Sequence, residues 1–320
     1  MKLSIVIPVY DVEPYVGKTL ETIFQTGANA DDFEVIVVND GAQDLSMEVV
    51  RQFADHPNLS ILEQENQGVS VARMNGASVA KGDYIWFVDS DDWLVEDAVG
   101  TVLRLLEERP DAEVLMFPLM WVYDDPSKNH LDYSVDEVLK LEGKKVLKEW
   151  GLPVWASQRF VLKRKLMDNE WLFFPKGVTH QDEYFGPVLM WLTNRVYVMK
   201  DPVYLYRIWS GSGMHTLSVR SSYNMITVHK CLMHFMEHSV APEDRDWFRQ
   251  YSCRCLELGY SRLSHLFGTR PFNRFIRTNR IYVCRQWLAA NGDKPIKNKL
   301  GRLFYFGFPA LRVFCLGKNA

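Results

Sequence analysis

The sequence lacks the features of disulfide-rich, zinc-binding and membrane-spanning proteins. Its five cysteines all lie after residue 230, without paired spacing and without a nearby series of histidines, so neither a disulfide framework nor a zinc site is expected. No apolar stretch of eighteen residues passes without a charge or a breaker, so no spanning helix is expected. The first apolar run ends at Asp11 without a small-residue cleavage site, which predicts a cytoplasmic protein without a signal peptide.

Two common phosphate-binding signatures are missing as well. The first apolar run is not followed by GxGxxG, which argues against a dinucleotide-binding fold of the dehydrogenase kind, and GxxxxGK[ST] does not occur. The glycine-rich N-terminal loop of sugar-1-phosphate nucleotidyltransferases is also absent. The composition is 47% hydrophobic and 24% charged, which excludes a disordered chain and favours a packed globular protein.

Short apolar runs alternate with segments of helical spacing in the first half of the chain. The runs begin at Leu3, Phe33, Leu59 and Tyr84, and each is too short for a helix. This alternation predicts an α/β fold with a mostly parallel sheet flanked by helices, whose ligands bind outside the carboxyl ends of the strands. Helical spacing without strands after about Tyr223 predicts a helical C-terminal region. We therefore expect a domain over residues 1–220 and a helical region over residues 221–320.

An acidic cluster directly follows the apolar run that ends at Val88. Asp89, Asp91 and Asp92 place three carboxylates within four residues, and these repel one another unless a cation holds them. Mg²⁺ and Mn²⁺ take oxygen ligands and leave room for substrate phosphates, so the cluster is a candidate metal site. The alternative is an acidic turn in which Asp92 or Ser90 caps the next helix.

Polar residues also end the first two apolar runs. Pro8 and Tyr10 lie at the end of the first, and Asp40 follows the run that begins at Phe33. Each could belong to an ordinary turn. At one sheet edge, however, Tyr10 could stack on a nucleobase and Asp40 could accept a ring N–H, while the acidic cluster holds a metal. The three strand ends together predict a site for a nucleoside diphosphate.

A set of motifs runs through most of the first 215 residues. In chain order they are Ser4–Tyr10, Val37–Gly41, Asn66–Gly68 with Ala72 and Arg73, Gly82–Asp92, Phe174–Pro175, Gln181–Phe185, and Leu205–Arg207 with Ser212. In these motifs the sequence resembles the family 2 glycosyltransferases of the GT-A fold, bacterial enzymes that transfer sugars from nucleotide sugars to glycans. Three positions depart from the family pattern: Gln181 replaces Glu, Met74 replaces Asn and Ala42 replaces Ser.

The resemblance implies a role for each matching residue. The nucleotide-sugar-binding residues would be Pro8, Tyr10, Asp40, Arg73, Asp89, Ser90 and Arg207. Tyr10 and Asp40 would hold uracil, while Asp89 and Asp91 would handle the ribose and the Mn²⁺ or Mg²⁺ ion bound to the diphosphate. Asp182 would be the catalytic base of an inverting reaction, in which an acceptor hydroxyl displaces the diphosphate at the anomeric carbon. Arg207 would meet the diphosphate or the acceptor, its alternative being an ordinary surface arginine.

These implications lead to a specific functional hypothesis. We expect a metal-dependent, inverting glycosyltransferase that moves a sugar from a UDP-sugar to a hydroxyl of a glycan or lipid-linked oligosaccharide in surface polysaccharide biosynthesis. The polysaccharide role rests on analogy with the family alone. The alternative is a non-catalytic, membrane-associated scaffold of the same fold that binds sugar nucleotides without turnover.

The C-terminal segment differs from the rest of the chain in the sign of its net charge. Residues Arg270–Ala320 carry a formal charge of +10, whereas the rest of the chain carries −13. No recognised nucleic-acid-binding module accompanies this charge, so nucleic acid is not expected as a partner. Because basic residues alternate with residues such as Phe272, Phe275 and Phe304, we expect peripheral binding to the anionic inner face of the cell membrane. The alternative is a solvated pair of basic helices that closes the core.

Overall fold

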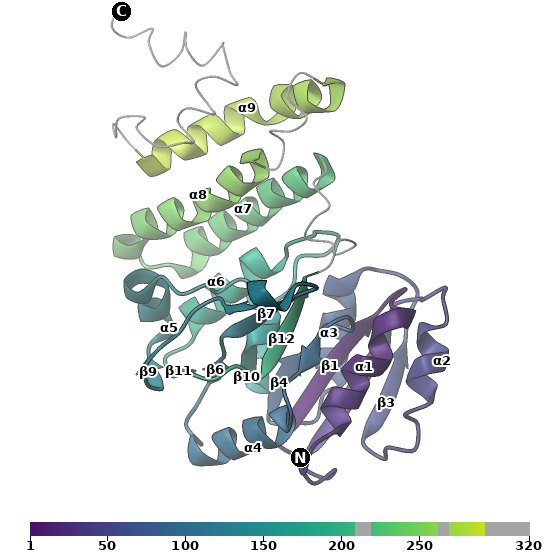
Figure 1. Ribbon diagram of the computed structural model, residues 1–320. Helices are drawn as coiled ribbons and strands as arrows, with labels where there is room; N and C mark the ends of the chain where they lie inside the picture. The colour runs from purple at the N-terminus through teal and green to yellow at the C-terminus, as the bar shows by residue number, and fades with distance from the viewer. Residues whose placement is uncertain (209–218, 262–268, 292–320) are drawn as a thin grey trace, which may run out of the picture. The chain divides into compact units, whose positions relative to one another are not determined.

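The computed structural model describes residues 1–208, 219–261 and 269–291 (Figure 1). The expected membrane-binding residues of 292–320, including Phe304, lie outside this description, as does Ser212. The chain forms two compact units, Met1–His215 and Thr216–Ala320, which are called the N-terminal and C-terminal units below. The strands described lie in the N-terminal unit.

The N-terminal unit is built on an eight-stranded sheet with the strand order β3-β2-β1-β4-β10-β6-β11-β9. The strands are β1 Leu3–Val9, β2 Phe33–Asn39, β3 Leu59–Glu63, β4 Tyr84–Phe87, β6 Val114–Met116, β9 Leu139–Leu141, β10 Phe160–Lys163 and β11 Val196–Val198. β1 pairs in parallel with β2 and β4, and β2 pairs in parallel with β3, so the carboxyl ends of four strands meet at one edge. The predicted α/β fold with a mostly parallel sheet is confirmed at this half of the sheet.

Helices pack on the sheet because its strands β1, β2 and β4 are buried on both faces. The helices are α1 Glu13–Phe24, α2 Ser46–Arg51, α3 Val69–Val79, α4 Ala98–Glu108, α5 Gly143–Lys145 and α6 Asp182–Leu192, with short helical turns at Pro126–Lys128, Val146–Trp150, Ser157–Arg159 and Arg164–Asp168. A further short turn, Pro242–Asp244, belongs to the C-terminal unit. Ile5 and Ile7 of β1 share one buried cluster with Leu20 of α1. On α3, a Cβ at Gly76 would lie 2.3 Å from Cγ1 of Val6, so only glycine permits this close approach.

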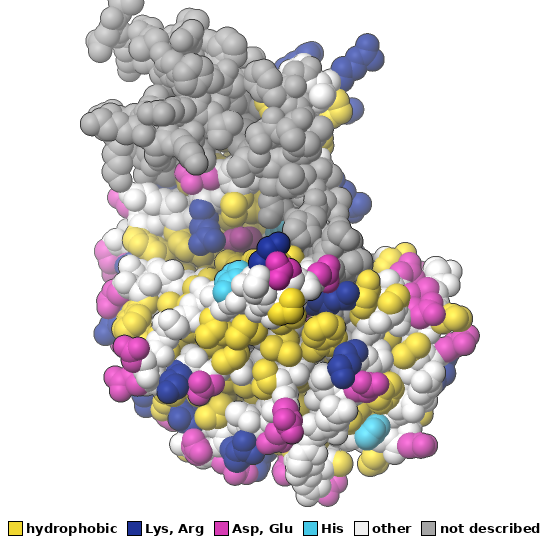
Figure 2. Space-filling view, in the orientation of Figure 1, with side chains coloured by type: hydrophobic (Ala, Val, Ile, Leu, Met, Phe, Trp, Pro, Cys, Tyr) yellow, Lys and Arg dark blue, Asp and Glu magenta, His cyan; other side chains and the backbone are white. Residues whose placement is uncertain are grey.

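A second sheet has four strands in the order β5-β12-β7-β8. It pairs β12 with β5, the short strand that follows β4 in the chain. Its strands are β5 Trp93–Leu94, β7 Leu119–Tyr123, β8 His130–Leu131 and β12 Tyr204–Ile208. β12 is antiparallel to β5 and parallel to β7. Figure 2 shows hydrophobic side chains gathered on one face over β7 and β12. No local pattern in the sequence predicts this second sheet. The sheet nevertheless positions Tyr204 and Arg207 beside the acidic cluster.

Within its described residues, the C-terminal unit contains the long helices α7 Val219–Ser239, α8 Arg245–Ser261 and α9 Arg270–Asn291, which pack against one another (Figure 1). This confirms the predicted helical C-terminal region. Phe275 of α9 is buried with its ring 4.8 Å from that of Tyr223, and Phe272 is buried too, so these two phenylalanines face the protein interior. None of the described helices is both long enough and apolar enough to cross a membrane.

Candidate active site

Three charged side chains from distant parts of the sequence meet at the carboxyl edge of the parallel strands. Arg73 of α3 is only 2% exposed, and its Nη2 donates to Oδ1 of Asp89, which follows β4, over 2.6 Å. Its Nη1 lies 3.5 Å from Oδ1 of Asp182, the first residue of α6. The guanidinium also lies 5.1 Å from the ring centre of Phe174. Arg73 therefore links the residue predicted for the metal to the residue predicted as catalytic base.

Burial and charge act in opposite directions on this group. Burial by itself would lower the pKa of Arg73, but the carboxylates of Asp89 and Asp182 raise that pKa above its usual value. For Asp182, burial raises the pKa above that of an ordinary aspartate, although Arg73 lowers it in part. A carboxylate with a raised pKa is a stronger proton acceptor. Asp182 also keeps 20% of its side chain exposed to solvent.

Gln158 is a member of this site that the sequence did not reveal. It is buried in the turn Ser157–Arg159, and its Nε2 donates to Oδ2 of Asp89, the oxygen opposite to the one that Arg73 holds. Nε1 of Trp86 donates to the backbone carbonyl of Gln158 over 2.7 Å and so fixes the turn against β4. A single glutamine outside any motif gave no signal in the sequence, because its role depends on a neighbour 69 residues away.

The acidic cluster forms a pocket of carboxylate oxygens rather than a helix cap. Ligand oxygens of Asp89, Asp91 and Asp92 all lie within 4.8 Å of one another. The buried Asp92 accepts hydrogen bonds from Oη of Tyr204 over 2.7 Å and from the backbone N–H of Arg207 over 2.8 Å. Its pKa is raised because it is buried, and secondarily because Asp91 and Asp89 are nearby.

The alternative in which Asp92 or Ser90 caps the next helix is wrong. α4 begins at Ala98 with Asp97 in the N-cap position, and β5 lies in between. Ser90 is buried, and its backbone carbonyl accepts from Oγ1 of Thr19 over 2.8 Å, so the structure places it beneath the cluster. Asp92 is held in the same way by its own carbonyl. Three carboxylates supply the hard oxygen ligands that Mg²⁺ and Mn²⁺ prefer, so the cluster fits such an ion.

The predicted uracil residues lie at the adjoining ends of β1 and β2. Tyr10 is 45% exposed and so presents its ring for stacking, while Pro8 is buried within β1. Asp40 is buried and accepts from Nε2 of Gln64, N of Gln67 and N of Gly68 over 2.7 to 2.9 Å. Because a carboxylate has about four acceptor positions, these three hydrogen bonds leave about one acceptor position on Asp40. Beside Asp40 lies a shallow hollow of about 560 Å³, lined by Gly41, Gln43, Glu63, Gln64, Glu65 and Asn66.

Arg207 lies against aromatic rings at the same edge. Its guanidinium carbon is 4.2 Å from the ring centre of Tyr15 and 5.6 Å from that of Trp93. Stacking of this kind fixes a cation that would otherwise sample many rotamers. Both rings and the hydrogen bond from its backbone N–H to Asp92 hold Arg207 beside the acidic cluster. Its contact with a diphosphate or an acceptor stays a prediction.

Comparison with known proteins assigns the family. Residues 4–170 match the family described as Glycosyl transferase family 2. The chain belongs to this family. It is similar to glycosyltransferase GlyA of Streptococcus pneumoniae, with 32% sequence identity over 66% of this chain and 31% of GlyA. It is also similar to glycosyltransferase GlyG of the same organism, with 32% identity over 67% of this chain and 73% of GlyG. The chain thus spans less than a third of the length of GlyA.

A solved structure shows the same fold as this family 2 chain. The crystal structure of Staphylococcus aureus TarS 1–349 in complex with UDP-GlcNAc aligns with a TM-score of 0.67. The alignment covers 96% of this chain and 87% of that structure at 19% sequence identity. The predicted GT-A fold with a helical C-terminal region is therefore confirmed, whereas the nucleotide and metal assignments for individual residues stay predictions.

Proposed function

We propose that the chain transfers a sugar from a UDP-sugar to an acceptor hydroxyl, with inversion at the anomeric carbon, in the assembly of a cell-surface glycan. The observation that carries this proposal is the buried Arg73, which links Asp182 to Asp89 of the acidic cluster at the edge where the parallel strands end. One end of the site thus offers a base and the other offers carboxylates for a metal, as displacement of a diphosphate requires.

Each group has a distinct task in the proposed reaction. Asp182 accepts the proton of the attacking acceptor hydroxyl, which raises the nucleophilicity of its oxygen. Asp89 and Asp91 would hold Mn²⁺ or Mg²⁺, which when bound neutralises negative charge on the diphosphate leaving group. Tyr10 and Asp40 would bind the nucleobase, and Arg207 would contact the diphosphate or the acceptor.

The choice of UDP rests on the site and on the relatives. An exposed aromatic ring at Tyr10 and an acceptor at Asp40 suit a pyrimidine with a ring N–H. TarS is named a poly(ribitol-phosphate) β-N-acetylglucosaminyltransferase, and its structure holds UDP-GlcNAc. The alternative of a non-catalytic scaffold requires the same nucleotide site but no working base. Asp182, with its raised pKa and partial exposure, favours the enzyme.

Calorimetric titration with UDP tests the proposed nucleotide site. We expect UDP to bind in the presence of Mn²⁺ and to lose about ten- to hundredfold in affinity with EDTA or in an Asp91→Ala variant, since interactions with charged groups contribute about 1.5–3 kcal/mol. Asp168→Ala, which removes an exposed carboxylate elsewhere, is the matched control and should bind as the wild type does. Unchanged affinity with EDTA, or much tighter binding of GDP than of UDP, would show that the site is wrongly assigned.

We also propose that the basic surface of α9 binds an anionic membrane. Arg270, Arg274 and Arg277 are all exposed, and their spacing places them along one side of the helix. A basic residue near an anionic surface contributes about 1 kcal/mol, and salt screens this attraction. The buried Phe272 and Phe275 do not insert, so charge supplies the attraction within the described residues.

Co-sedimentation with liposomes tests this membrane proposal. The full chain should bind vesicles that contain phosphatidylserine, and a triple variant with Arg270, Arg274 and Arg277 replaced by Gln should bind about a hundredfold more weakly. High salt should release the wild type. Equal binding to neutral and anionic vesicles, or no binding to either, would refute the membrane assignment and leave the transferase proposal intact.

A further inference from the structure

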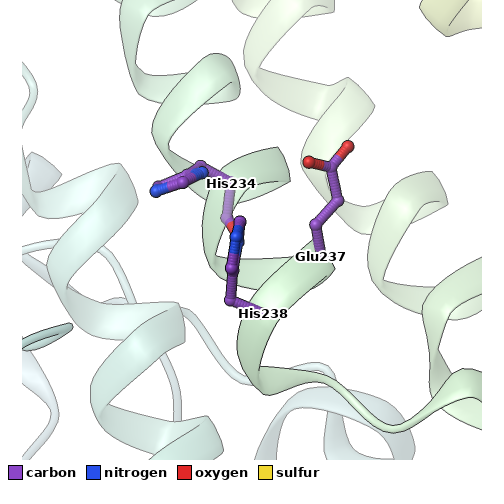
Figure 3. Close-up of side chains that lie close together, drawn as sticks. All are labelled: His234, Glu237 and His238. Carbon is purple, nitrogen blue, oxygen red and sulfur yellow. The ribbon is translucent and has the colours of Figure 1, made fainter.

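The last turns of α7 carry three side chains of the kinds that bind transition metals. His234, Glu237 and His238 are all exposed, and residues three and four apart lie on the same side of a helix. Their ligand atoms lie within 4.8 Å of one another. Figure 3 shows the two imidazole rings close together with the carboxylate of Glu237 beside them. The C-terminal unit therefore contains a ligand group unrelated to the acidic cluster.

A hydrogen bond prepares His238 to act as a ligand. Nδ1 of His238 lies 2.8 Å from the backbone carbonyl oxygen of His234. Because a carbonyl oxygen can only accept, Nδ1 carries the proton and Nε2 carries the lone pair. Histidines that bind metals commonly donate the other ring N–H to a carbonyl or carboxylate in this way, which fixes the tautomer and the ring orientation. A metal ion bound by His238 would therefore be coordinated through Nε2.

The position on the helix also favours a cation. His238 lies one residue before the end of α7, where the helix dipole presents partial negative charge. Arg245 donates to the carbonyls of Glu237 and Val240, each over 3.0 Å, and so keeps this last turn ordered. The two rings lie 4.3 Å apart between their centres. Because the backbone of this turn is held and the two imidazole rings are adjacent, rotation of the side chains alone would bring the three ligand groups together.

We propose that His234, Glu237 and His238 bind one divalent transition-metal ion, with Zn²⁺ as the preferred occupant. Two imidazoles and a carboxylate suit Zn²⁺ and neighbouring metals, whereas Mg²⁺ and Mn²⁺ prefer the all-oxygen acidic cluster. Zn²⁺ bonds of about 2.0–2.1 Å require ligand atoms about 3.3 Å apart, and the exposed side chains have room to close to that distance. Three protein ligands leave a fourth position for water. The cysteine pattern gave no hint of this site, because it uses no cysteine.

Zinc titration of the full chain, without an affinity tag and with excess Mg²⁺ to saturate the acidic cluster, tests the proposal. We expect one Zn²⁺ per chain, with affinity at least tenfold lower in His238→Ala and in His234→Ala. His130→Ala removes an exposed histidine of the N-terminal unit and is the matched control. Absence of zinc binding, or wild-type affinity in both histidine variants, would overturn the proposal.

Thermal unfolding gives an independent readout that does not require activity. Zn²⁺ should raise the melting temperature of the wild type because it binds only the folded state. The same concentration of Zn²⁺ should raise the melting temperature of His238→Ala by clearly less, and the two proteins should melt alike without metal because the side chain is exposed. An equal zinc-dependent rise in both proteins would contradict the site. Neither result depends on the glycosyltransferase proposal.

Discussion

Replacement of Asp182 by Asn is expected to reduce turnover by about 10²- to 10⁴-fold, the usual contribution of a general base. Asn has nearly the same shape but cannot accept the proton of the acceptor hydroxyl. Oδ1 of Asp182 lies 3.5 Å from Nη1 of Arg73, and the same guanidinium binds Asp89. The substitution should therefore slow the chemical step and not weaken nucleotide binding. UDP affinity in the presence of Mn²⁺ should therefore stay close to that of the wild type.

The pH dependence of turnover provides a second readout for Asp182. A base must be deprotonated, and burial raises the pKa of Asp182, so activity should fall as the pH drops through a value above the ordinary aspartate pKa of about 3.9. Asp182→Asn should remove this acidic limb. Glu170→Gln neutralises an exposed carboxylate and should change neither turnover nor the limb. Near-normal turnover in Asp182→Asn would exclude Asp182 as the base.

Replacement of Arg73 by Ala is expected to lower the free energy of unfolding by about 3–5 kcal/mol, the usual cost of breaking a buried ion pair. The guanidinium is 2% exposed and is the shared partner of Asp89 and Asp182. Without it, two carboxylates face each other in a partly buried site. Turnover should fall as well, because both the base and the predicted metal ligand lose the group that positions them. Urea denaturation at neutral pH measures the stability change.

Two further variants separate this role from a general effect of removing an arginine. Arg104 forms an exposed pair with Asp97, its side chain being 59% exposed, so Arg104→Ala should change stability by less than about 1 kcal/mol. Arg73→Lys keeps the charge but loses the planar fork and should be intermediate. If Arg73→Ala were as stable as Arg104→Ala, the buried link between Asp89 and Asp182 would not hold the site together.

The parallel half of the sheet could be predicted because its signals are local. β1 begins at Leu3, where the first predicted apolar run begins, and β4 ends one residue before the predicted Val88. Strands buried on both faces read as continuous apolar runs. β10 and the second sheet could not be predicted in this way. β10 is four residues long, and β12 pairs with β7 across 85 residues of chain, so nothing local marks either pairing.

The candidate site was predictable only where a motif carried it. Asp89 and Asp91 were visible as an acidic cluster after a strand, and Asp182 followed from the resemblance alone. The bonds between them were not visible, because Arg73 and Asp182 are 109 residues apart. The structural role of Asp92 could not be predicted either. Asp92 is buried and accepts a hydrogen bond from Tyr204, a residue of the second sheet, which the sequence did not predict. Such roles are fixed by tertiary packing rather than by local sequence.

Release of UDP from a panel of UDP-sugars, measured with Mn²⁺ and a range of glycan acceptors, tests the central claim most directly. The account predicts that the wild-type chain releases UDP from at least one donor, and that both EDTA and Asp182→Asn suppress this release. A chain that binds UDP-sugars in the calorimeter but releases no UDP from any of them would contradict the account. That result would support the non-catalytic scaffold instead.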